Sequence, residues 1–330
     1  MNAPVIDVGG THVTAAFVDT VRWQTVDGTR RRTPLRSDGS AAEIVATLAS
    51  AIRPLGDISA SILGVSMPGP FDYDTGIGRF RDVGKFDALN GVDVGSALRT
   101  ALPTPPAGIV FLNDASAFAI GEWIGGAAQG ARRVVGITLG TGVGSAFLDR
   151  GQVISDGPAV PPDGYAHLLR IDGRPLEDVV SRRAIIAAYQ SAQSAAGSDP
   201  ARPPSVDVDT IERRAADGDA TARGVLDHAI GALGAALRPW LVRFGAEILV
   251  VGGGIATAWE LIEPALRDGL LRADTADTLS GQAWTGGKIV HSGDPEGSNL
   301  TGAAWHALNR HALNRHALNR ETGAPLDRSA

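Results

Sequence analysis

The chain has 330 residues, of which 44% are hydrophobic and 20% charged, a composition typical of a globular protein with an ample core. A net charge of -6 without a long basic run argues against a nucleic-acid partner, and no apolar run is long enough for a membrane span. There is no cysteine, which excludes disulfides and thiolate metal sites. The N-terminus lacks the pattern of a signal peptide, so we expect a cytoplasmic protein.

The first apolar run, residues 4–8, ends in Gly9-Gly10-Thr11. This pattern predicts a buried strand that enters a tight turn. Glycine lets the backbone approach a ligand, and free N–H groups with the Thr11 hydroxyl can face an anion. Asp7, inside the run, is a candidate magnesium ligand beside bound phosphates. An ordinary β-turn with a chance acid is the alternative interpretation.

Apolar segments separated by polar or glycine-rich stretches continue to residue 112. They predict strands at 13–18, 62–66 and 109–112, and helices at 41–53 and 93–102. The last of these strands runs into Asn113-Asp114 and a further helix. Asp114 is either the cap of that helix or a functional carboxylate at the carboxyl end of a strand, where α/β sheets bind their ligands.

Two more glycine-rich loops follow strands. Residues 133–139 lead into Gly140-Thr141-Gly142-Val143-Gly144, and residues 247–251 lead into Gly252-Gly253-Gly254 and a helix at 257–271. Repeated loops of this kind are far less expected by chance than one, and they are suited to a nucleotide.

Helices are predicted between and after these loops, at 176–196, 207–217, 220–244 and 299–310, with a strand at 288–291. His-Ala-Leu-Asn-Arg then occurs three times, at 306–310, 311–315 and 316–320. A period of five turns about 140° per step on a helix, so Leu308, Leu313 and Leu318 share no face. We therefore expect a solvated extension of the last helix that frays into a disordered end.

In this order, Asp7-Val8-Gly9-Gly10-Thr11, Asn113-Asp114 and the two later glycine loops resemble the motifs of the ROK family, which belongs to the actin-like ATPase superfamily. The resemblance covers about residues 4–310. It implies an α/β protein with the two-lobed actin-like ATPase (ribonuclease H-like) fold, in which mixed sheets are flanked by helices and a cleft separates the lobes. The expected parts are an N-terminal lobe at 1–115 joined by the returning helix 299–310, a C-terminal lobe at 116–298 and a repeat-containing tail at 311–330.

The resemblance also implies roles for individual residues. The first two glycine loops would bind the phosphates of ATP, with Mg²⁺ at Asp7, and the third loop would contact the adenosine. Asp114 matches the catalytic base, and it shares the sugar site with Gly69, Asn113, His167 and Glu177. The expected nucleotide-binding residues are Asp7, Gly9, Gly10, Thr11, Gly140, Thr141, Gly142, Gly144, Gly252, Gly253 and Gly254.

Two positions depart from the family pattern. Family members commonly carry a cysteine-rich zinc loop just after the histidine, but residues 168–176 contain no cysteine, so we expect no structural zinc. The family usually has glutamate three residues before the histidine, near the anomeric carbon of the sugar; here that position is Gly164, with Asp163 beside it. This change leaves the identity of the acceptor open without affecting phosphoryl transfer.

We therefore predict an ATP-dependent kinase that phosphorylates the exocyclic primary hydroxyl of a hexose or hexose-like ring, with glucose as the default acceptor. The alternative acceptors are a C7-cyclitol of the valiolone or valienol type, phosphorylated at position 7, and an amino sugar, phosphorylated at position 6. A sugar-sensing regulator is disfavoured because only four residues precede Val5, and a catalytically inactive ATP-binding module is disfavoured by the intact Asp7, Asn113 and Asp114. The family resemblance implies a homodimer, and no nucleic acid or membrane is expected as a partner.

Overall fold

The computed structural model describes residues 1–195, 206–271 and 284–322, with side chains up to residue 313. The chain divides into two compact units, which we describe separately: a first unit, Met1–Gly125 with Glu296–Ala330, and a second unit, Gly126–Pro295. The division falls at residue 125 rather than 115, so the helix that begins at Asp114 lies in the first unit together with the C-terminal helix. Within the described part of the chain, no helix is both long enough and apolar enough to cross a bilayer.

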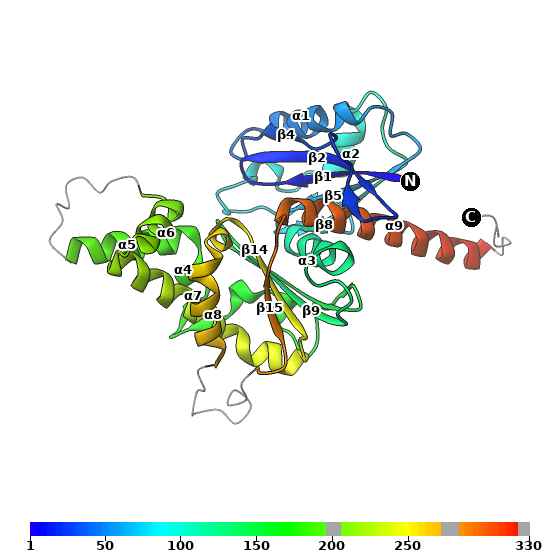
Figure 1. The fold of residues 1–330 in the computed structure, drawn as a ribbon. Helices are drawn as coiled ribbons and strands as arrows, with labels where there is room; N and C mark the ends of the chain where they lie inside the picture. The colour runs from blue at the N-terminus through cyan, green and yellow to red at the C-terminus, as the bar shows by residue number, and fades with distance from the viewer. Residues whose placement is uncertain (196–205, 272–283, 323–330) are drawn as a thin grey trace. The chain divides into compact units, whose positions relative to one another are not determined.

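The first unit is built on a mixed sheet of six strands (Figure 1). Its order is β3-β2-β1-β5-β8, and β4 also pairs with β2. The strands are β1 (Asn2–Val8), β2 (His12–Asp19), β3 (Gln24–Thr25), β4 (Arg31–Pro34), β5 (Ile62–Met67) and β8 (Gly108–Asn113). Strands β1 and β2 are antiparallel, whereas β1, β5 and β8 run parallel, so three strands of the first unit end at one edge of the sheet.

Helices cover both faces of this sheet (Figure 1). Because side chains alternate along a strand, Ile6 of β1 packs into one core with α1 (Ala41–Ile52) and α2 (Val94–Ala101), and Val5 packs on the other face with α9 (Pro295–Thr322). Ser40 and Glu43 form a capping box that begins α1. Helix α3 (Asp114–Gly125) meets α9 through Gly121 and Gly302, where a Cβ atom would clash with the backbone of the other helix. A small hairpin of β6 (Phe71–Asp72) and β7 (Ile77–Gly78) completes the unit.

The second unit contains a mixed sheet of five strands in the order β11-β10-β9-β14-β15. These are β9 (Arg133–Leu139), β10 (Val143–Asp149), β11 (Gln152–Val153), β14 (Ile248–Gly252) and β15 (Lys288–His291). Strands β9 and β10 are antiparallel, and β9, β14 and β15 are parallel. The predicted fold class, α/β with mixed sheets flanked by helices, is confirmed in both units.

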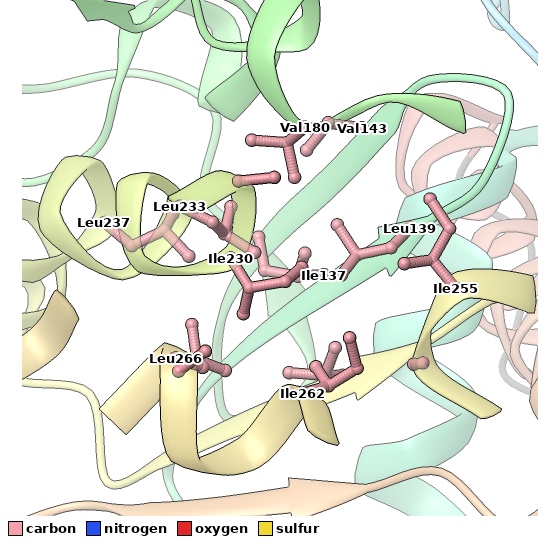
Figure 2. Packing of buried hydrophobic residues seen from close by; sticks show 14 of the residues in the cluster. Ile137, Leu139, Val143, Val180, Ile230, Leu233, Leu237, Ile255, Ile262 and Leu266 are labelled. Carbon is pink, nitrogen blue, oxygen red and sulfur yellow. The ribbon is translucent and has the colours of Figure 1, made fainter. Parts of the chain in front are cut away.

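The helices of the second unit bury an aliphatic core against its sheet. Figure 2 shows Ile230 and Leu233 from α7 (Ala220–Phe244), and Leu266 from α8 (Trp259–Leu271), together with Ile137 of β9. The remaining elements are α4 (Glu177–Val180), α5 (Arg182–Ala195), α6 (Val208–Ala216) and the hairpin of β12 (Arg170–Ile171) with β13 (Arg174–Pro175).

Two helices differ from their predicted bounds. The helix predicted at 176–196 is broken at Ser181, whose backbone is extended, and it forms α4 and α5. The last helix begins at Pro295 rather than at 299, and the repeats extend it to Thr322, because they consist mostly of good helix formers. Residues 323–330 of the expected disordered tail lie outside the described residues.

Candidate active site

The candidate site residues of the first unit lie where its three parallel strands end. Asp7 is opposite Ser66 in the β1–β5 register, and Met67 is opposite Asn113 in the β5–β8 register. The carboxyl ends of parallel strands are where open α/β sheets bind ligands. The register therefore gathers Asp7, the first glycine loop and Asn113-Asp114 along one edge.

The Asp7 carboxylate is buried and held from two directions. Ser66 Oγ donates to its Oδ1 at 2.6 Å, and Asn299 Nδ2, from α9, lies 3.2 Å from both carboxylate oxygens. Burial raises the pKa of Asp7 to about 6, although both hydrogen bonds act in the opposite direction. The sequence analysis missed Asn299, which is 292 residues from Asp7 in the chain.

The first glycine loop combines a fixed turn with an open backbone. Gly9 N–H donates to the carbonyl of His12 at 2.8 Å, which closes the turn between β1 and β2. The N–H groups of Gly10 and Thr11 have no acceptor among the described residues, and a Cβ on Gly10 would meet nothing within 4 Å. Free N–H groups at such a turn form an anion-binding concavity.

Asp114 is half-buried as the first residue of α3. Its Oδ1 accepts from its neighbour Ala115 N–H at 2.9 Å and from Asn113 Nδ2 at 3.1 Å, while Asn113 Oδ1 accepts from Ser116 N–H at 3.2 Å. Asn113 therefore caps the helix three residues on, the usual N-cap contact. Burial raises the pKa of Asp114, and the nearby charge of Lys85 acts against that rise.

Gly69 lies beside the same group of residues. A Cβ on Gly69 would come within 3.4 Å of the Tyr73 hydroxyl, which accepts from Asn113 Nδ2 at 3.0 Å and donates to the carbonyl of Met67 at 3.2 Å. Tyr73 thus fixes the Asn113 amide beside Asp114. It is a second site residue that the sequence analysis missed.

The second glycine loop is braced by the break between α4 and α5. Arg182 N–H, just after the break, donates to the carbonyl of Gly140 at 2.9 Å. Glu177 Oε2 accepts from Val143 N–H at 3.2 Å and would lie 2.6 Å from a Cβ on Gly142. Glu177, which the resemblance assigns to the sugar, therefore contacts the second glycine loop in this structure.

The third glycine loop lies next to the second. Gly252 is opposite Thr138 in the parallel register of β14 and β9, and a Cβ on Gly253 would clash with the backbone of Leu139. Gly253 has a φ of +92°, a conformation that glycine adopts readily. By contrast, Cβ atoms on Gly140 and Gly254 would meet nothing within 4 Å, so each loop keeps one open glycine.

The remaining candidate residues of the second unit are Thr141, Gly144 and His167. Gly144 lies within β10 rather than in the loop, and Thr141 lies at the turn between β9 and β10. His167 stacks on Tyr165 with 5.2 Å between ring centroids. Ser145 fixes the backbone before this histidine: its Oγ donates to the Gly164 carbonyl at 2.7 Å and accepts from Ala166 N–H at 2.7 Å. The expected sugar-binding residues are thus divided, with Gly69, Asn113 and Asp114 in the first unit and His167 and Glu177 in the second.

The residues around Asp7 fit a magnesium ion that is bound together with a nucleotide. Mg²⁺ in such sites is held by one or two carboxylates plus substrate phosphates. Asp7 supplies one carboxylate, and Asn299 Oδ1 is a buried oxygen without a hydrogen-bond partner. Over the described ranges, no group of three or more His, Cys, Asp or Glu side chains comes together as a protein-only metal cage.

The chain is similar to known proteins in sequence and in fold. The family model described as ROK family matches residues 4–162. A glucokinase of Thermotoga maritima is 28% identical over 286 residues, covering 80% of this chain and 85% of the relative, and a glucokinase of Halalkalibacterium halodurans is 27% identical, covering 78% and 82%. The crystal structure of a ROK family glucokinase from Streptomyces griseus, in complex with glucose and AMPPNP, shares the fold with a TM-score of 0.74 at 22% identity, covering 94% of this chain and all of that one. With its motifs in order and its two mixed sheets, the chain is therefore similar to the ROK family and to the glucokinases named above.

Proposed function

We propose that this protein is an ATP-dependent kinase that phosphorylates the exocyclic primary hydroxyl of a hexose or hexose-like ring. The observation that carries the proposal is the half-buried Asp114 carboxylate, which shares a sheet edge with Asp7 and the open first glycine loop. This edge combines a base for an alcohol with a backbone suited to an anion. Phosphoryl transfer to a hydroxyl needs these two features together.

In the proposed reaction the hydroxyl oxygen attacks the γ-phosphorus of ATP. The new O–P bond forms as the bond to the β-phosphate oxygen breaks, the hydroxyl proton passes to Asp114, and ADP leaves. General-base assistance of this kind contributes roughly 10²–10⁴-fold in rate. A magnesium ion bound with the nucleotide would neutralise phosphate charge. On the protein side, Asp7 would hold the metal, the free N–H groups of Gly10 and Thr11 would contact phosphate oxygens, and Asn113 would orient Asp114.

The relatives support the choice of substrates. Two of the curated relatives are named glucokinases, and the Streptomyces griseus structure holds glucose and AMPPNP. Glucose is therefore our first candidate acceptor and ATP the first candidate donor. The test is release of ADP from Mg·ATP by the wild-type protein in a coupled assay with glucose and a panel of other sugars. Failure of every sugar and cyclitol acceptor to release ADP above the no-acceptor rate would contradict the proposal.

One observation favours a second class of acceptor, a ring altered near the anomeric position. Gly164 takes the place of the glutamate that the family resemblance implies, and its φ of +71° is a conformation that favours glycine. Asp163 beside it is exposed. A site that loses a hydrogen-bonding group discriminates less against ligands that lack the partner hydroxyl. A C7-cyclitol or an amino sugar would fit this change.

The two acceptor classes are separated by kcat/KM for glucose against C7-cyclitols and amino sugars. Better use of a cyclitol supports the second class. A kcat/KM for glucose above about 10⁴ M⁻¹s⁻¹ that exceeds the value for every other acceptor would rule it out. Gly164→Ala is a better companion variant than Gly164→Glu. The left-handed backbone at this position strains any side chain, and alanine shows the effect of that strain without adding a polar group.

A further inference from the structure

A group of basic side chains stands beside the first glycine loop on the face of the sheet that α9 covers. In the β2–β4 register Arg32 is opposite Thr14, and directly opposed residues of antiparallel strands point to the same face. His12 and Arg30 are two residues from these positions and share that face. We call Arg30, Arg32 and His12 the basic flank of the loop.

Glu296, at the start of α9, is close to His12 and Arg30 of the basic flank. Its Oε1 accepts from Thr14 Oγ1 at 2.6 Å and lies 3.4 Å from His12 Nε2, and its Oε2 lies 3.9 Å from Arg30 Nη1. Glu296 is thus shared among three neighbours, of which Arg30 is the charged one. Among the described side chains, no hydrogen bond or ion pair joins it to Arg32.

Arg32 is attached to the loop through His12. Its Nη2 lies 3.0 Å from His12 Nδ1, and the Thr11 hydroxyl lies 3.2 Å from the same nitrogen. A ring nitrogen that accepts from a guanidinium carries no proton, and burial with the charge of Arg32 lowers the pKa of His12. The positively charged guanidinium of Arg32 and the Thr11 hydroxyl thus lie next to the same histidine nitrogen. Among the residues with described side chains, no acidic group forms an ion pair with Arg32.

We infer that Arg32 binds the terminal phosphate group of the phosphate donor. The inference rests on the proposed kinase function. The first glycine loop, next to the guanidinium, has free N–H groups at Gly10 and Thr11 that can contact a phosphate. The planar guanidinium itself matches the geometry of two phosphate oxygens. A donor with a third phosphate gains this contact, whereas its diphosphate product loses it. Arg32 would thus favour binding of donor over product.

The adjacent residue on the same strand provides a matched control. Arg31 is opposite Ala15, whose side chain belongs to the core on the α1 face, and its own Nη1 donates to the carbonyl of Arg30 at 3.0 Å. Arg31→Gln removes the same charge from the same strand but from the opposite face. Any long-range effect of net charge should therefore be equal in Arg31→Gln and Arg32→Gln.

The experiment is isothermal titration calorimetry of Mg·AMPPNP and Mg·ADP with the wild type, Arg32→Gln, Arg32→Lys and Arg31→Gln. Because hydrogen bonds to charged groups are among the stronger ones, Arg32→Gln should weaken AMPPNP binding about tenfold and ADP binding by less than about threefold. Arg32→Lys should fall between wild type and glutamine, since it keeps the charge but not the planar fork. Arg31→Gln should match the wild type for both nucleotides, and thermal melting should show that all four proteins are folded.

The outcomes separate the two proposals. Equal affinity of Arg32→Gln and the wild type for AMPPNP would overturn the role of Arg32 and leave the kinase proposal intact. So would an equal loss for AMPPNP and ADP, which indicates a general effect on the loop. Absence of nucleotide binding by the wild type would overturn the kinase proposal and, with it, the inference.

Discussion

The two units of the molecule share a strand pattern but differ in what stands at the carboxyl ends of their strands. In both, an antiparallel hairpin (β1–β2 or β9–β10) is followed by two parallel neighbours (β5 and β8, or β14 and β15). In the first unit this edge carries ionisable side chains, Asp7 and Asp114. In the second unit it carries two adjacent glycine loops, whose backbone is held by other parts of the same unit.

This difference teaches that one topology can support two kinds of site. Parallel strand ends supply an edge in each case, because loops converge there. Desolvation raises the pKa of both carboxylates at the first edge, which is typical of groups that take part in chemistry. Backbone N–H groups at the second edge can hold a ligand without titrating. We therefore expect substitution of the carboxylate base at the first edge to affect turnover, and substitutions in the glycine loops of the second edge to affect stability and nucleotide binding.

The largest effect should come from Asp114→Asn. The amide keeps the size of the side chain and can still accept from Ala115 N–H, but it cannot take a proton from the acceptor hydroxyl. Turnover should fall roughly 10²-fold or more, while AMPPNP binding measured by calorimetry should persist. Asp93→Asn is the control, because Asp93 is an N-cap on α2, where it accepts from Ser96 N–H at 2.8 Å. Similar turnover in the two variants would contradict a role of Asp114 as the base.

The next effect concerns the glycine loops. Gly253→Ala places a methyl group against the backbone of Leu139 in a left-handed conformation, so it should lower the free energy of unfolding by about 2–4 kcal/mol. Gly10→Ala, whose Cβ meets nothing within 4 Å, should change the free energy of unfolding by less than about 1 kcal/mol. Urea denaturation measures both. Equal losses would mean that the second edge is no more tightly packed than the first.

Much of this comparison was accessible from the sequence. The sequence predicts strands at both edges because apolar runs followed by glycines are local patterns, and it makes Asp114 a candidate because this residue follows such a run directly. Asn299 and Tyr73 could not be found in this way, because each reaches the site from a distant segment without a motif. A long-range contact also decides the break at Ser181: apolar periodicity continues through it, whereas Arg182 N–H turns to the carbonyl of Gly140.

A smaller effect is expected from a buried acid in the helical layer of the second unit. Glu212 is 6% exposed, its Oε1 has no hydrogen-bond partner, and burial raises its pKa to about 7. The native state then binds the proton more tightly than the unfolded state, so stability is highest below about pH 4.5, where both states are protonated, and it decreases as the pH rises through about 7. Asp7 and Asp114 lie at the sheet edge of the first unit, whereas Glu212 lies on α6.

Glu212→Gln tests this difference without altering shape. It should raise the free energy of unfolding at pH 8 by about 1 kcal/mol or more and flatten the decrease between pH 5 and 8. Denaturant titrations at several pH values give the comparison. Glu260→Gln is the control, since Glu260 is exposed on α8 and is not among the charges that raise the pKa of Glu212, so its change should leave the pH profile nearly as in the wild type. A wild-type stability that increases from pH 5 to 8, and increases equally in Glu212→Gln, would contradict the assignment.

The smallest effect should come from the five-residue repeats in α9, because the first repeat packs only partly against the core of the first unit and Leu313 of the second repeat is exposed. Leu308 packs partly buried against the small core formed by β1, β2 and α9, whereas Leu313, at the same position of the next repeat, is 66% exposed. A five-residue step turns a helix by about 140°, so the second leucine cannot follow the first onto the sheet. Leu308→Ala should therefore lower the free energy of unfolding by about 1 kcal/mol, less than the same change at a fully buried leucine would, and Leu313→Ala should leave it unchanged.

Removal of residues 311–330 should likewise preserve melting temperature and turnover. A loss from Leu313→Ala or the truncation as large as that from Leu308→Ala would show that the repeats contribute an interface, and that the first unit extends beyond its sheet and site.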